Sequence, residues 1–207
     1  MTAVRQRFDG RIAGVGTTSG TRLVVGRWTR TPLGPFADVM VERADGWRVL
    51  LAPSAVVRDV IEATYVFDEV RIEPVEVADV DAPTGMPGWR VSTGSLELDL
   101  DIGTRPLLGR LLRLVPRPLA TSTGWATLID PVAGRVVAGV RTRGTARAGR
   151  REWYGATDLH RVVAVRGRFD DGDLGHLAPV DPPCRFGFSS TPRSPSVTTV
   201  VTTIEQR

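Results

Sequence analysis

The chain has 207 residues, of which 42% are hydrophobic and 24% are charged, and it carries a formal net charge of +4. All 27 basic residues are arginine, because the sequence contains no lysine. This absence excludes Schiff-base and pyridoxal phosphate enzymes, protein kinases and P-loop nucleotidases, all of which need a lysine amine. Length and composition are those of an ordinary globular protein, and we expect residues 1–207 to form a single domain.

The composition also argues against metals and several kinds of partner. The single cysteine, Cys184, excludes an internal disulfide, and two histidines are too few for a His-rich metal site, so we expect no metal and no cofactor. Acids are spread along the chain, which predicts no nucleic-acid partner. No apolar run reaches the roughly 18 residues of a membrane span. Residues 1–10 lack the apolar core of a signal peptide, so we expect a cytoplasmic location. The oligomeric state is left open.

The first half of the chain shows mostly the alternation typical of strands. Asp45 and Gly46 lie between two apolar runs and predict a tight hairpin turn. Ser54 suits the N-cap of a short helix whose apolar stripe includes Val57 and Ile61. We therefore expect strands at residues 21–28, 36–43, 47–51 and 69–77, a helix at 54–64 and a loop at 79–88.

The second half continues this pattern with one further helix. Thr104 can cap a helix that has Pro106 in its first turn and ends at Pro116. Beyond it, residues 131–134 read as a turn between two strands. We expect strands at 89–102, 125–130, 135–147 and 197–204, a long strand at 151–169 that is bent or bulged, and a Pro/Gly/Ser-rich loop at 170–196.

These elements predict an α+β protein. Hairpin-length turns join most of the strands, so the sheet should be mainly antiparallel. We expect a curved sheet or a partly open β-barrel, with two short helices packed on it.

The sharpest cluster of polar residues lies in the hairpin expected at 135–165. With a turn at Gly149 and Arg150, Thr145 faces Tyr154 and Arg141 faces Asp158. One face of the hairpin then carries a polar wall. A carboxylate beside an imidazole can tune a general base, and two arginines can grip an anionic ligand. The alternative is a solvated, salt-bridged sheet face. The residues of this wall are Arg141, Arg143, Tyr154, Asp158 and His160.

Two further patterns have a functional and a structural interpretation. The expected second helix combines a leucine stripe with four arginines, Arg105, Arg110, Arg113 and Arg117. Such a helix can lie on an anionic membrane, although packing on the sheet with solvated arginines is the favoured interpretation. Glu97, Asp99 and Asp101 share one strand face. Three carboxylates can bind a hard cation, but a solvated face or an arginine-rich neighbouring strand is favoured.

Residues 28–38, with the sequence WTRTPLGPFAD, resemble the Gly-Pro-aromatic-x-acid segment of acetoacetate decarboxylase-like proteins. The resemblance implies a cone-shaped antiparallel barrel around a small-molecule pocket, and Asp38 matches the acidic position of that family. Those decarboxylases act through a lysine, which this chain lacks, so the resemblance implies the fold and pocket without the reaction.

Three functions follow as hypotheses. The first is a pocket that binds an apolar or acyl molecule, which could be anionic, without complete catalytic machinery; Arg141, Arg143 and Asp38 are its candidate ligand-binding residues. The second is a lysine-free hydrolase, lyase or isomerase that uses Tyr154, Asp158 and His160. The third is a structural or protein-interaction module that uses residues 178–196 or the arginine-rich face.

Overall fold

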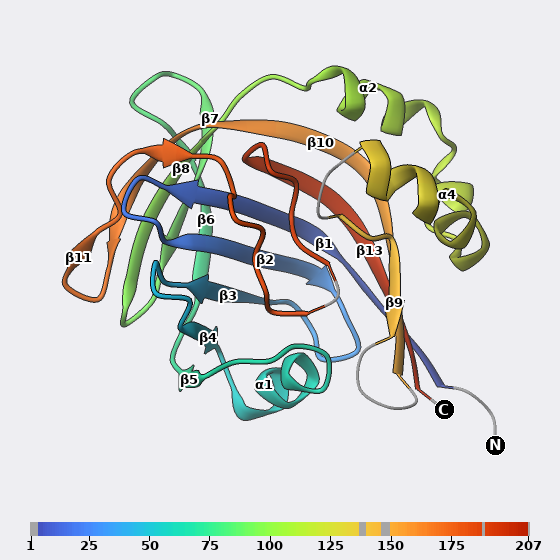
Figure 1. Ribbon diagram of the computed structural model, residues 1–207, viewed down its shortest axis with the longest axis horizontal. Helices are drawn as coiled ribbons and strands as arrows, with labels where there is room; N and C mark the ends of the chain where they lie inside the picture. Colours follow the sequence, from blue (N-terminus) through green and yellow to red (C-terminus); the bar gives the residue numbers. More distant parts are fainter. Residues whose placement is uncertain (1–3, 137–139, 146–149, 188, 207) are drawn as a thin grey trace.

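A computed structural model describes residues 4–136, 140–145, 150–187 and 189–206. The described strands form one large, curved and unclosed sheet in the order β5-β4-β3-β2-β1-β13-β10-β8-β7-β6 (Figure 1). In addition, β9 and β11 pair with β10, and β12 pairs with β1. The expected α+β class is confirmed. The strands are β1 (Val4–Thr17), β2 (Arg22–Arg30), β3 (Phe36–Glu42), β4 (Arg48–Ala52), β5 (Glu69–Ile72), β6 (Glu76–Asp81), β7 (Pro87–Ser92), β8 (Leu96–Ile102), β9 (Arg143–Thr145), β10 (Arg150–Phe169), β11 (Gly172–Asp173), β12 (Leu177–Ala178) and β13 (Ser196–Gln206).

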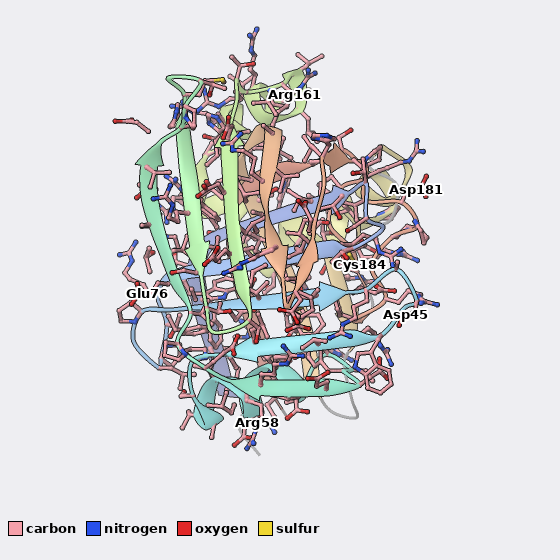
Figure 2. The ribbon with its side chains drawn as sticks, turned by 90° about the vertical axis from the view of Figure 1, so that its left-hand side faces the viewer. Asp45, Arg58, Glu76, Arg161, Asp181 and Cys184 are labelled. Atoms are coloured by element: carbon pink, nitrogen blue, oxygen red, sulfur yellow. The ribbon has the colours of Figure 1, made fainter. Side chains whose placement is uncertain are left out.

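The long strand β10 bends the sheet into two layers. Its first half pairs with β13, and its second half pairs with β8, so β8, β7 and β6 fold back over the rest of the sheet. Figure 2 shows these green strands crossing in front of the blue strands β1 to β3. The pairing register shifts twice along β10, between Ala156 and Asp158 and between Val162 and Ala164. The expectation of a bent or bulged strand at 151–169 is therefore confirmed.

The main hydrophobic core lies between these two layers. It takes alternate side chains from the strands, among them Val25, Val39, Trp89 and Leu98, and each of these is at most 2% exposed. Burial of one face of each strand fixes its register, because a shift of one residue would move the apolar set to the other face. The opposite face of β1, β2, β3 and β13 is thus left for other contacts.

The first helix, α1 (Ala55–Glu62), forms as its sequence predicts. The Ser54 hydroxyl accepts a 3.3 Å hydrogen bond from the amide of Val57, and Val57 and Ile61 are buried. The helix connects β4 to β5, which pair in parallel. The other pairings of the described strands are antiparallel, as expected.

The strand expected at 125–130 is wrong. The described part of the chain has four helices rather than two: after α1 come α2 (Leu107–Leu114), α3 (Arg117–Ala120) and α4 (Thr123–Val136). Ser122 caps α4 by accepting a 3.1 Å hydrogen bond from the amide of Trp125. Pro131, interpreted as a turn residue, lies inside this helix. Trp125 and Ile129 are four residues apart and both line one cavity, but that spacing fits one face of a helix and one face of a strand equally, so the sequence pattern did not distinguish the two.

The register expected for the following hairpin is wrong as well. β9 pairs with β10 so that Thr145 lies opposite Arg151, not opposite Tyr154. The expected turn residue Gly149 lies outside the described residues. α4 takes the residues up to Val136, and the strand described between α4 and β10 is β9, which has three residues and pairs with β10.

Other boundaries differ in smaller ways. β1 at Val4–Thr17 was not expected, and β6 and β7 extend into the expected loop at 79–88. The expected loop at 170–196 contains the two-residue strands β11 and β12. Over the described ranges, no helix has the length and apolar character that crossing a membrane requires.

Candidate binding pocket

A cavity of about 550 Å³ lies on the face of β1, β2, β3 and β13 that is opposite the main core. Its floor comes from five strands, and the side chains that face it alternate with those of the core. On β1, for example, Phe8 and Ile12 face the cavity while Ala13 and Val15 belong to the core. The volume falls within the roughly 300–1,000 Å³ of small-molecule sites. The apolar floor also includes Val24, Met40, Leu159, Val200 and Ile204.

Helices and a loop cover this floor. Figure 1 shows α2 above β10 and α4 beside the right-hand end of β10. Close approach of α2 requires Gly109, because a Cβ there would lie 2.2 Å from the carbonyl oxygen of Leu159. Gly155 likewise allows α3 to approach β10 closely, because a Cβ at this position would lie 2.6 Å from the carbonyl oxygen of Ala120. The cover contributes Val60, Ile61, Leu108, Leu111, Leu112, Val115, Trp125, Ile129 and Phe186.

One carboxyl group, that of Asp38, is part of the apolar wall. It is 3% exposed, and its Oδ1 accepts a 2.8 Å hydrogen bond from the indole N–H of Trp28. Burial raises the pKa of Asp38 to about 7, although the Trp28 hydrogen bond lowers it. The bond passes beside Gly26, where a Cβ would lie 2.4 Å from Oδ1. Near neutral pH this group can therefore either donate or accept a hydrogen bond.

A second polar group on the wall centres on Glu152, which is 2% exposed. Its carboxylate accepts hydrogen bonds from Thr64, at 2.6 Å, and from the Tyr154 hydroxyl, at 3.1 Å. The Tyr154 hydroxyl also bonds that of Tyr65. Arg150 lies 3.6 Å from the same carboxylate and donates to the carbonyl of Val60.

Burial dominates the acid-base behaviour of this group. It raises the pKa of Glu152, against the lowering effect of Thr64 and Arg150, and it raises the pKa values of Tyr65 and Tyr154 well above the usual value. The two tyrosines are thus neutral hydrogen-bonding groups.

Two of the lining residues are exposed and mark the mouth of the cavity. Leu111 on α2 is 51% exposed, and the side chain of Arg141 is 59% exposed. Asp130 on α4 lies 3.4 Å from the Arg141 guanidinium. Arg143 is exposed and does not line the cavity; its amide donates to Asp130. The structure therefore separates the two arginines that the sequence grouped.

The structure also divides the expected polar wall. The extra residue Thr157 forms a β-bulge in β10. Before the bulge the even-numbered Tyr154 and Ala156 face the cavity, and after it the odd-numbered Leu159 does. Asp158 and His160 then point to the other face of the sheet, into a separate hollow of about 370 Å³. A bulge inserts one residue into the alternation, which is why the face changes.

Within that second hollow, Asp158 is held by Arg105. The guanidinium donates two hydrogen bonds to the carboxylate, of 2.6 and 2.8 Å, and this ion pair lowers the pKa of Asp158. The Nε2 atom of His160 lies 3.6 Å from the carboxylate, and its Nδ1 lies 3.1 Å from the carbonyl oxygen of Gly103. The expected neighbourhood of Asp158 and His160 is present, but Tyr154 is not part of it, and a catalytic role for the three stays a prediction.

The three carboxylates on β8 each pair with an arginine of a neighbouring strand. Asp99 contacts Arg90 at 2.9 Å, and Asp101 contacts Arg166. Glu97 lies 3.2 Å from Arg168. These contacts agree with the arginine-rich neighbouring strand favoured by the sequence. Across the residues that the structure describes, no group of three His, Cys, Asp or Glu side chains is arranged to hold a metal ion.

Several residues of the site were missed by sequence reasoning. Thr64, Tyr65 and Arg150 meet Glu152 from distant parts of the chain, and no local pattern marks them. Asp38 does have a local signal, because it stands two residues from Phe36 and from Met40, so that an acid lies between two apolar residues of one strand face.

Comparisons with known proteins give no family. No protein-family model and no curated protein matches the chain. A search of solved structures finds a candidate AttH protein from Nitrosomonas europaea, at 12% identity and a TM-score of 0.31, over 98% of this chain and 51% of that one. The chain thus spans about half the length of that protein. A likeness this low supports neither fold nor function, and the resemblance of residues 28–38 to acetoacetate decarboxylase-like proteins is not confirmed.

Proposed function

We propose that this protein binds an apolar small molecule in the cavity between the sheet and α1, α2 and α4. The observation that carries the proposal is the cavity itself, with about 550 Å³ of space and walls that are almost wholly apolar. Small-molecule sites typically combine such walls with a few placed polar groups. Asp38 and the Glu152 group are those polar groups here. A pocket of this kind is also what the resemblance at residues 28–38 implies.

The charges of the site suggest how the ligand lies. Asp38 and Glu152 are buried carboxyls in the wall, and the one buried arginine among the lining residues, Arg150, already contacts Glu152. An anionic group placed deep in the cavity would be repelled by the ionised form of these carboxyls, and it would lose its hydration without a free buried cation among the lining residues. Arg141 at the mouth is the cation that such a group would meet. The apolar body therefore lies inside, and any anionic end lies at the mouth beside Arg141.

Native mass spectrometry with two chain-matched probes, dodecanol and dodecanoate, tests binding. Each probe should give a one-to-one complex. The variant Ala156→Phe places a phenyl ring in the cavity and should abolish both complexes, whereas Leu128→Phe, at an α4 position that is 70% exposed, should leave both unchanged. Absence of any complex, or equal binding by wild type and Ala156→Phe, would overturn the proposal.

The same probes test the orientation. Arg141→Gln should weaken dodecanoate binding about fivefold to tenfold, because it removes a charge-assisted hydrogen bond, and should leave dodecanol unaffected. Arg143→Gln is the matched control, since Arg143 lies nearby but does not line the cavity. Equal effects of the two substitutions would remove Arg141 from the site.

A further inference from the structure

The outer face of α2 exposes leucines that nothing in the described structure covers. Leu107, Leu111 and Leu114 are 71%, 51% and 78% exposed. They stand at positions i, i+4 and i+7 and therefore share one side of the helix. Leu108 and Leu112 point the other way and line the cavity. The helix thus has two apolar faces, and the fold uses only one of them.

Exposed leucines continue along the rest of the cover. Leu119 on α3 is 45% exposed, and Leu128 on α4 is 70% exposed. Figure 1 shows α2 and α4 next to each other at one end of the molecule. Clustered exposure of this kind marks an interaction surface, whereas single exposed leucines are ordinary.

The segment that carries these leucines is rich in arginine, and the nearest acid along α4 is Asp130, which contacts Arg141. Residues 103–129 contain no aspartate or glutamate and include four arginines. Arg105 and Arg117 are paired with Asp158 and Asp9. Arg110 and Arg113 are exposed, and within the described ranges neither has an ion-pair partner. Arg110 lies three residues after Leu107 and four before Leu114, so it borders the leucine face, and Arg113 lies one turn beyond Arg110 on the flank of that face.

From this arrangement we infer that the α2–α4 cover is a docking surface for an anionic phospholipid membrane. Leucines that enter the acyl boundary, flanked by arginines that meet lipid phosphates, form the pattern of an interfacial helix. Leu111 belongs both to this surface and to the mouth of the cavity. Docking would therefore bring the mouth against the bilayer, where apolar molecules are dissolved.

Vesicle flotation tests the inference with the whole chain. The protein should float with vesicles of phosphatidylcholine mixed with phosphatidylglycerol and should remain below vesicles of phosphatidylcholine alone. Binding should weaken as salt is raised, because salt screens the attraction between the arginines and the lipid. Equal binding to both kinds of vesicle, or binding to neither, would overturn the inference.

Paired variants separate the contribution of the leucines to vesicle binding from that of the arginines. Leu107→Ser with Leu114→Ser should lower the affinity for mixed vesicles by at least about tenfold, since two large apolar side chains no longer enter the bilayer. Arg110→Gln with Arg113→Gln should lower it about fivefold for each arginine removed. The control for the leucine variant is Val56→Ser with Ile72→Ser, and the control for the arginine variant is Arg30→Gln with Arg151→Gln. Both controls alter exposed side chains elsewhere and should bind vesicles as wild type does.

Two outcomes distinguish this inference from neighbouring ones. A dimer in analytical ultracentrifugation that the leucine variant dissolves, without vesicle binding, would assign the surface to a second copy of the chain and overturn the inference. Docking does not depend on an occupied cavity, so Ala156→Phe should still bind mixed vesicles. Failure of the pocket and failure of the docking surface are thus measured independently.

Discussion

The indole N–H of Trp28 on β2 donates a 2.8 Å hydrogen bond to Asp38 on β3, and this bond lies in the wall of an apolar cavity. Gly26 leaves the space through which the two side chains meet. The pair places one titratable carboxyl among apolar side chains without a cation as its hydrogen-bond partner. The protonation state of Asp38 therefore affects the stability of the fold and its dependence on pH.

Asp38 should make the protein lose stability as the pH rises. Its pKa is about 7 in the folded state against an ordinary 3.8, so the folded protein binds this proton more tightly than the unfolded chain does. The stabilisation is fully present below about pH 4 and is lost as pH rises through about 7. Each tenfold difference in proton affinity between the two states corresponds to about 1.4 kcal/mol, so the effect on stability is at most a few kcal/mol.

Urea unfolding of wild type and Asp38→Asn at a series of pH values measures this effect. Between about pH 4 and pH 8 the unfolding free energy of wild type should fall relative to that of Asp38→Asn, because only wild type acquires a buried charge. Carboxyls with lowered pKa values, such as Asp68 and Asp158, act in the opposite direction in both proteins and cancel in the difference. Parallel curves for the two proteins would show that Asp38 does not titrate in this range.

Gly26→Ala should destabilise the fold by about 1–3 kcal/mol, because a methyl group there would lie 2.4 Å from Asp38 Oδ1 and 2.6 Å from Trp28 Nε1. Either the hydrogen bond or the strand must shift. Gly124→Ala in α4 is the control; its Cβ would meet nothing within 4 Å, and alanine favours a helix. Equal urea midpoints for the two variants would contradict the close approach at Gly26.

The contributions of Arg150 and Glu152 to the free energy of unfolding should be coupled. They are 8% and 2% exposed, and Arg150→Met would leave the Glu152 carboxylate buried with hydroxyl partners but no cation. We expect a cost of about 3–5 kcal/mol for this change, and a double variant with Glu152→Gln that costs less than the two single changes together. A double-mutant cycle in urea unfolding gives the coupling. Strict additivity would mean that the 3.6 Å contact contributes nothing.

Tyr154→Phe and His160→Gln should differ in their effects. Tyr154 lines the cavity and bonds Glu152, so its loss should cost about 1–3 kcal/mol of stability and weaken dodecanol binding. His160 faces the other hollow, and its substitution should leave dodecanol binding unchanged. Native mass spectrometry and urea unfolding of both variants test this. Equal losses of binding would favour the joint wall of Tyr154, Asp158 and His160.

The patterns along the chain predicted most of the architecture. Alternation at residues 21–28, 36–43 and 197–204 indicated strands that the structure contains, and Ser54 marked the start of α1. These predictions succeed because strand and helix periodicities are local, and a cap bonds to its own helix. The helix α4 was missed because Trp125–Asp130 is short and apolar enough to fit either period, and Pro131 suggested a turn.

The sequence by itself determined the absence of lysine chemistry and the sheet-dominated class. Only the tertiary structure decided which side chains meet. Side chains alternate with a period of two, so the one extra residue at Thr157 sends Tyr154 into the cavity and Asp158 to the opposite face. Glu152 likewise meets Thr64 only because the fold brings together residues 88 positions apart. A local pattern specifies an element, but the contacts between distant elements depend on how they pack.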